Sequence, residues 1–483
     1  MLSSHRSWLP ALLMICGLSA PAYAQHQPTD DAPTHIDAPS SQAQPMSFEQ
    51  ALHHLRGEDQ NVRAAHAAVQ RAEAERKVMF GKFFPEASVR ARAIRMDAPI
   101  ELTLDPVRDR LESLPIPLPP AFIPDFRYEI QRQGFFSVTL DAQMPLFTGG
   151  RLMAGLRAAD LAIEASAFEA QEALDAGTTE LVKRYFGARM ADEAYNVRKQ
   201  TADSLKLHAQ NAQRLEEEGQ ISRAERLRAE VAYAEAQMEL ESAERQQRLT
   251  KEALRTLLSQ DVEIEPTSNF FEVPYAPNLQ ELQQTALEHN PKFQAGSIGQ
   301  RRAHEAVRAV RGEFSPTLGA FALVEIYRGD LTVLDPAWAI GLQLEWNIFQ
   351  GAQRFHKLDA AKALEQEVAL KVGRASQDIP LLVEQKHQAY TEALSQLRQF
   401  QRTQELAEES VYAQTRAFEA GMATSLDVVD AELTLSRVNL GILNALYKSN
   451  VAYAELMEAV GQSAHLLDMI QHPTSNVHPE VSP

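Results

Sequence analysis

Residues 135–150 read FFSVTLDAQMPLFTGG, and residues 338–351 read WAIGLQLEWNIFQG. In both stretches apolar side chains alternate with small or polar ones, and a Phe-x-Gly step ends the alternation. The two stretches lie 202 residues apart, which predicts that the chain is a two-fold internal repeat. Alternation over roughly ten residues predicts one strand in each repeat, at about 134–147 and 336–349.

Two shorter matches extend the repeat on either side of these strands. Residues 215–219 recur at 417–421 with the same offset of 202, whereas residues 81–85 recur at 312–316 with an offset of 231. The drop from 231 to 202 places an insertion of 29 residues in the first repeat. We assign it to 96–125, where prolines cluster, and expect a loop, or a loop with one helical turn near 106–114.

The same order of elements is expected in both repeats: helix, strand, loop, strand, long helix, turn, helix. The first repeat occupies 46–270 and the second 271–465, with the expected paired elements at 47–83 and 278–314 (first helices), 86–95 and 317–327 (first strands), and 150–218 and 351–420 (long helices). Long helices of this size reach roughly 100 Å, far beyond a globular helix. Gly177 and Pro380 lie near their midpoints, at matching places in the repeats, and are expected to bend or loosen them.

The ends and the composition of the chain narrow the class of protein. Residues 1–24 carry the pattern of a secretory signal peptide, 25–45 read as a disordered lead-in, and 466–483 form a polar tail. The chain has 483 residues and a formal charge of −18, which argues against a nucleic-acid partner. Cys16 is the only cysteine, and no HExxH, nucleophile elbow or phosphate loop is present. We therefore expect no enzyme, no cofactor and no metal site.

The strands and the last helix together suggest a closed, ring-shaped assembly. The strands have the length of tilted membrane strands, although a soluble sandwich would show the same alternation. The helix after 425 carries two opposed apolar seams with a polar strip between them, as a stave in a tube would, although a helix buried in a bundle is the alternative. Four strands cannot close a membrane barrel, so closure needs two or three chains.

The sequence resembles the TolC-like outer membrane efflux proteins over nearly all of the chain after residue 46. The resemblance rests on the Pro-Leu-Phe-Thr-Gly-Gly step at 145–150 with its echo at 347–351, the turn glycines Gly219 and Gly421, and residues 426–431 (LDVVDA). It implies a mainly α protein with a small β part: a homotrimer that completes a long α-helical barrel and a membrane β-barrel with four strands per chain. It also implies location in the outer membrane of a Gram-negative bacterium, in contact with its lipid and extending into the periplasm.

The resemblance further implies a passive exit duct of a tripartite efflux or type I secretion system, docked on a periplasmic adaptor and an inner-membrane pump. Asp427 and Asp430 match the aspartates that narrow the periplasmic aperture of the family, although solvated surface acids are the alternative. Glu225 and Phe418 fall at members of the family's tip network, whose basic position is Ala423 here, so that salt link cannot form as in the family. The turns around Gly219 and Gly421 are the expected adaptor-docking tips. A rival interpretation is a periplasmic adaptor with a long helical hairpin.

Overall fold

The structure, a computed structural model, describes residues 43–113, 126–271, 277–327, 336–464 and 466, which all belong to one unit beginning at Gln42. The expected signal peptide at 1–24 lies outside the described residues, as do residues 25–42 of the lead-in and 467–483 of the tail. The last residues of the expected lead-in belong to a short strand, because β1 begins at Gln44 and ends at Met46.

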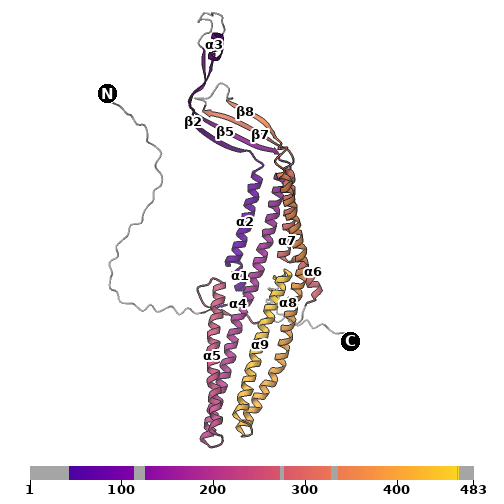
Figure 1. Ribbon diagram of the computed structural model, residues 1–483. Coiled ribbons are helices and arrows are strands. Elements are labelled where there is room, and N and C mark those ends of the chain that lie inside the picture. Colours follow the sequence, from indigo (N-terminus) through magenta and orange to yellow (C-terminus); the bar gives the residue numbers. More distant parts are fainter. Residues whose placement is uncertain (1–42, 114–125, 272–276, 328–335, 465, 467–483) are drawn as a thin grey trace, which may run out of the picture. The chain divides into compact units, whose positions relative to one another are not determined.

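A four-stranded antiparallel sheet joins the two repeats. Its strands are β2 (Glu86–Arg95), β5 (Gly134–Phe147), β7 (Thr317–Tyr327) and β8 (Trp338–Glu345), in the order β2-β5-β7-β8. The two repeats meet where β5 pairs with β7 (Figure 1). The last strand ends four residues before the expected limit of 349, because β8 pairs with β7 only as far as Glu345, opposite Thr317. Among the described strands, β2 and β8 are the two edges of this sheet.

The register separates an apolar face of the sheet from a polar one. Leu140 lies opposite Val89 on one side and Val324 on the other, and Ile340 continues the apolar face with 75% of its surface exposed. Arg90 and Asp141 project from the other face and form an ion pair of 3.8 Å. Exposed aromatic side chains lie at both ends of the apolar face, including Trp338 and Trp346. No other described element of the chain packs extensively on this sheet.

The insertion in the first repeat is more ordered than the expected loop. It contains β3 (Ile100–Thr103) and α3 (Asp105–Glu112), the latter at the expected helical turn, and β3 pairs in antiparallel fashion with β4 (Arg127–Gln131), which begins just after the expected end of the insertion. The alternation Ile100-Glu101-Leu102-Thr103 is a strand signal that the high proline content concealed. The rest of the expected loop, 114–125, lies outside the described residues.

The long helices match each other in length and carry the fold. α4 (Arg151–Glu217) and α8 (Gln353–Glu419) contain 67 residues each, and both run without interruption through the positions expected to loosen them. At Gly177 a side chain would lie 3.4 Å from Leu55, so the missing Cβ permits close packing of another helix. Gln283, which lies outside α8, donates a hydrogen bond of 3.1 Å to the carbonyl of Pro380. No helix in the described part of the chain is both long enough and apolar enough to cross a bilayer.

Each expected first helix is in fact two helices. The first repeat has α1 (Phe48–Glu58) and α2 (Gln60–Gly81), and the second has α6 (Leu279–His289) and α7 (Pro291–Gly312). The breaks fall at Asp59 and Asn290, which adopt extended conformations and whose side chains cap the next helix. Proline at 291 disfavours a helical conformation at Asn290, and both residue types prefer the N-cap position.

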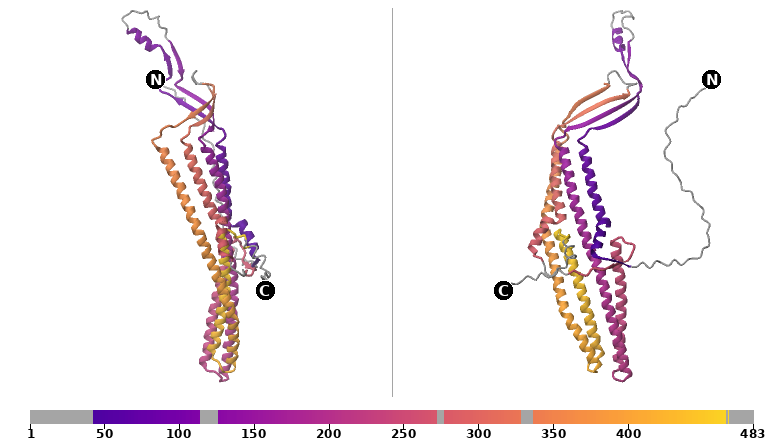
Figure 2. Two further views of the ribbon diagram at one scale, coloured as in Figure 1. Left: turned by 90° about the vertical axis from the view of Figure 1, so that its right-hand side faces the viewer. Right: turned by 180° about the vertical axis from the view of Figure 1, so that it is seen from behind.

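The remaining helices complete two long hairpins. α5 (Arg223–Leu257) packs on α4, and α9 (Ser425–Val460) packs on α8 and on α4 (Figures 1 and 2). The main core lies against the middle of α4, where Phe48, Tyr185 and Phe186 form ring contacts of 5.3 to 5.4 Å. The short parallel pair of β1 with β6 (Ile264–Pro266) borders this core. Glu455 accepts from Lys183 at 2.7 Å and from Lys386 at 2.8 Å, which ties α9 to α4 and α8.

A buried acid near this core gives the first prediction. Burial raises the pKa of Asp175 from 3.8 to about 6, although the Gln171 amide donates to it at 2.8 Å. An acid whose pKa is raised on folding lowers stability as pH rises between the two values, and this shift of the pKa from 3.8 to about 6 corresponds to about 3 kcal/mol. Asp175→Asn should therefore raise the thermal midpoint of the purified protein, by an amount that grows from pH 4 to pH 6 and is constant above.

The control for this prediction is Glu169→Gln, which changes an exposed acid of the same helix. Thermal unfolding across the pH range should show no pH-dependent rise of the thermal midpoint for that variant. The prediction would be contradicted if the rise in thermal midpoint of the Asp175→Asn protein did not change with pH.

Candidate functional site

The two turns that join the long helices to α5 and α9 lie side by side at the end of the hairpins remote from the sheet (Figure 1). Gly219 and Gly421 end α4 and α8 with φ of 75° and 72°, and the residue after each donates to a carbonyl five residues back at 2.8 Å. This is the αL helix ending that glycine favours. A Cβ at either glycine would meet nothing within 4 Å, and the neighbouring Met422 is 79% exposed. Both turns therefore offer open surface.

The start of α9 presents two exposed aspartates. Thr424 and Asp427 form a capping box, in which one carboxylate oxygen of Asp427 accepts from the Thr424 amide at 2.8 Å and from its hydroxyl at 2.7 Å. These two hydrogen bonds lower the pKa of Asp427, so it keeps its negative charge below the usual range. Asp430 is exposed one turn later, while Val428, Val429 and Ala431 are buried. The two carboxylates thus lie on one solvent-facing side of α9.

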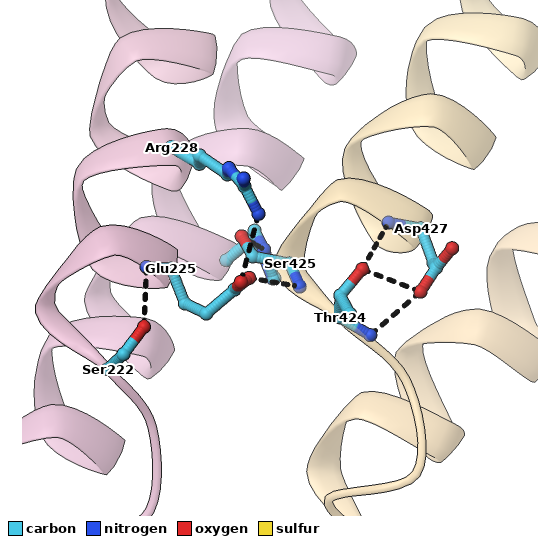
Figure 3. A network of polar contacts seen from close by, with 7 residues as sticks. Ser222, Glu225, Arg228, Thr424, Ser425 and Asp427 are labelled. Atoms are coloured by element: carbon cyan, nitrogen blue, oxygen red, sulfur yellow. Dashed lines mark hydrogen bonds and ion pairs between the residues drawn. The ribbon is translucent and has the colours of Figure 1, made fainter.

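Glu225 connects the two helical hairpins. One of its oxygens accepts from the backbone N–H of Ser425 at 2.9 Å, and the other accepts from Arg228 at 3.0 Å (Figure 3). Ser425 is the first residue of α9, so the carboxylate sits at a helix N-terminus, where negative charge is favourable. In Figure 3 Asp427 points away from α5, on the other side of the α9 N-terminus from Glu225. Glu225 thus bridges α5 and α9, while Asp427 remains available to solvent.

A histidine reinforces this link from α4. His208 is buried and its Nε2 lies 2.8 Å from the hydroxyl of Ser425, which has no exposed surface. Its ring lies 4.8 Å from that of Phe418, which is only 3% exposed. Burial lowers the pKa of His208, which favours a neutral ring. The tip network, as we call Glu225, His208, Ser425 and Phe418, therefore draws on all four helices of the hairpins.

The structure brings some of the sequence-predicted site residues together and separates others. Glu225 and Phe418 both contact Ser425 or His208, whereas Ala423 contributes only an apolar contact. Sequence reasoning missed His208 and Ser425. The spacing of Thr424 and Asp427 marks the helix start and could have revealed Ser425, whereas nothing in the sequence distinguishes His208 from the other scattered histidines. Within the described ranges, no group of three or more His, Cys, Asp or Glu side chains could hold a metal ion.

Comparison with known proteins matches both repeats to one family. Residues 51–260 and 282–462 match the family described as Outer membrane efflux protein. The cobalt-zinc-cadmium resistance protein CzcC of Cupriavidus metallidurans is 26% identical over 332 residues, which cover 66% of this chain and 77% of CzcC. The alkaline protease secretion protein AprF of Pseudomonas aeruginosa is 24% identical, over 69% of this chain and 70% of AprF.

A solved structure supports the fold over a longer stretch. The open state of the Neisseria gonorrhoeae MtrE outer membrane channel superposes with a TM-score of 0.67 at 18% identity. The match covers 86% of this chain and 89% of MtrE. The two proteins therefore share the arrangement of long helical hairpins and a small sheet although few of their residues are identical.

Proposed function

The chain belongs to the family of outer membrane efflux proteins, and on this basis we propose that its helical tips form the gated end of the channel. The protein is a passive exit channel in the outer membrane of a Gram-negative bacterium and not an enzyme. It works as a homotrimer with a periplasmic adaptor and an inner-membrane pump. The family match over both repeats leaves no support for the rival interpretation as a periplasmic adaptor.

The proposed aperture is a ring of aspartates at the tips. Asp427 and Asp430 are exposed on one side of α9, and threefold symmetry repeats them three times around the channel axis. A narrow ring of carboxylates attracts cations and binds multivalent ones most strongly. The hydrogen bonds from Thr424 lower the pKa of Asp427 and so favour its charged form, which supports this role. Cations are accordingly expected to pass or block this end in preference to anions.

The proposed latch is the tip network. Its supporting observation is the hydrogen bond of 2.9 Å from the Ser425 amide to Glu225, because this bond joins a charged side chain of one hairpin to the helix start of the other. Outward movement of the α8–α9 hairpin from α4 and α5 would break this bond and the contact of His208 with Ser425. The network replaces, with a helix N-terminus, the salt link that Ala423 makes impossible.

Glu225→Gln tests the latch. Glutamine preserves the shape and an acceptor oxygen but removes the charge at the α9 N-terminus and the ion pair with Arg228. Hydrogen bonds to charged groups contribute about 1.5–3 kcal/mol, so the open probability of single channels in planar bilayers should rise about tenfold. Glu235→Gln, which neutralises an exposed acid of the same helix, is the control and should leave gating unchanged. Identical gating of the Glu225→Gln channel and wild type would refute the latch.

The turns at 215–222 and 417–425 are the proposed docking surface for the adaptor. Their support is the open space around Gly219 and Gly421 and the exposure of Met422, an adaptable apolar side chain, at the extreme end of a hairpin. Docking at this end would place the adaptor next to the aspartate ring and the latch. Contact with the adaptor could then be coupled directly to separation of the hairpins.

A further inference from the structure

The insertion of the first repeat presents a two-faced hairpin. In the pairing of β3 with β4, Leu102 lies opposite Tyr128, and Glu101 lies opposite Glu129. Because neighbouring residues of a strand point to opposite faces, one face carries Leu102, Tyr128 and Ile100 and the other carries the two glutamates. The three members of the apolar face are 54%, 49% and 51% exposed, respectively. We call them the hairpin face.

Nothing in the described part of the same chain covers the hairpin face. β3 and β4 make their substantial contacts with each other, and no other described element packs extensively on them. An isolated two-stranded hairpin is marginal in water and needs a third strand or a packed face for stability. The hairpin face therefore lacks a cover among the described residues of its own chain and is open to an adjacent molecule.

The position of the hairpin indicates where that occupant comes from. The amide of Met96 donates to the carbonyl of Gln133 at 2.7 Å, so the pairing of β2 with β5 continues towards β3 and β4. β2 is an edge of the four-stranded sheet, and β8 is the other edge. In a closed homotrimer the β2 edge of one copy must meet the β8 edge of the next, which places the hairpin at the boundary between two copies. Acidic and basic side chains nearly balance in 100–113 and 126–132, which does not suit an anionic lipid surface.

We propose that the hairpin face of each copy docks on the adjacent copy of this chain, so that three insertions form a collar at the end of the sheet remote from the helices. The inference rests on the trimeric assembly of the channel. The opposed glutamates favour this orientation, because like charges facing each other are tolerated only where water solvates them. The second repeat has no matching insertion. A ring can still close, because each of the three copies contributes one insertion.

Site-specific crosslinking between copies tests the collar. Leu102→Cys and its neighbour Glu101→Cys place a thiol on opposite faces of the same strand, and Cys16, the only cysteine of the chain, is replaced by serine in both variants. A short bismaleimide is applied to intact cells, and labelling with a monofunctional maleimide in detergent measures how many thiols can react. Covalent dimers, the largest product that one thiol per chain allows, should form at least tenfold more from Leu102→Cys than from Glu101→Cys.

The crosslinking pattern distinguishes a collar between copies from a hairpin that lies against lipid. Equal crosslinking from both positions, or none from Leu102→Cys in a protein of trimeric mass, would overturn the collar and leave the channel intact. A Leu102→Cys thiol that reacts in detergent but neither crosslinks nor labels in membranes would assign the hairpin face to lipid instead. A purified protein of monomeric mass would refute the trimer itself.

Discussion

Neutralising both tip aspartates, in Asp427→Asn with Asp430→Asn, should weaken block of the channel by divalent and trivalent cations at least tenfold and raise its conductance. Six carboxylates would otherwise converge at one constriction of the trimer, where their attraction for a multivalent cation adds up at short range. Block and conductance are measured on single channels in planar bilayers, with the multivalent cation added from the side of the tips.

The choice of asparagine matters because Asp427 has two roles. Its carboxylate oxygen accepts from the amide and the hydroxyl of Thr424, and an asparagine oxygen can accept the same bonds. Asp427→Ala would remove charge and cap together and is the matched comparison for helix fraying. If the loss of block came from fraying of α9, only the alanine variant would show it. Wild-type block in the double asparagine variant would exclude the aspartate ring.

The pH dependence of the same block provides an independent check. Because the Thr424 hydrogen bonds lower the pKa of Asp427, the carboxylate charge is retained as pH falls through the usual aspartate range. Since the carboxylates of a ring raise one another's pKa, the effect of these bonds is measured by comparing wild type with a variant that lacks one of them. Thr424→Ala removes the hydroxyl bond, so its block should fade at a higher pH than in wild type.

The architecture could be predicted from the sequence because the periodicity of apolar residues and the internal repeat extend over whole helices and strands. Strands β2, β5 and β7 and both long helices are visible as alternation or as long helix-favouring runs, and the offsets of 231 residues before the insertion and 202 after it identified their counterparts in the other repeat. The breaks at Asp59 and Asn290 were missed because each depends on a single residue that caps the helix after it. The apolar pattern on either side continues without a change of period.

The tip network shows a different limit of sequence reasoning. From the sequence, Ala423 indicated only that the expected salt link was lost, because the loss of a basic side chain is visible at a single position. Its replacement depends on a backbone amide, that of Ser425, and on His208 more than 200 residues away in the chain. The spacing of Thr424 and Asp427 marks the start of α9 but not the partner of its first amide, since any residue other than proline at 425 supplies the same N–H, and α4 carries many polar positions. A backbone donor of this kind becomes visible only once the two hairpins are packed.

Export should fail in Gly421→Trp while the trimer still reaches the outer membrane, and this is the second large effect that we expect. A Cβ at Gly421 meets nothing within 4 Å, so the bulky ring would project from the tip without disturbing the packing of its own chain. The left-handed backbone at 421 costs a side chain about 1–2 kcal/mol, which a helix of this length tolerates. The loss would therefore come from a blocked docking surface, and transport of the cargo is expected to fall at least tenfold.

Gly421→Asn separates docking from strain, because asparagine is tolerated in the left-handed region and is small. That variant should export nearly as well as wild type, and its trimer should unfold at a temperature at least as high as that of Gly421→Trp. Gly219→Trp and Gly219→Asn repeat the comparison on the other turn, whose backbone has nearly the same φ. Full export in both tryptophan variants would place the adaptor contact elsewhere on the hairpins. If instead Gly421→Asn failed as badly as Gly421→Trp, the turn conformation and not its open surface would be what transport requires.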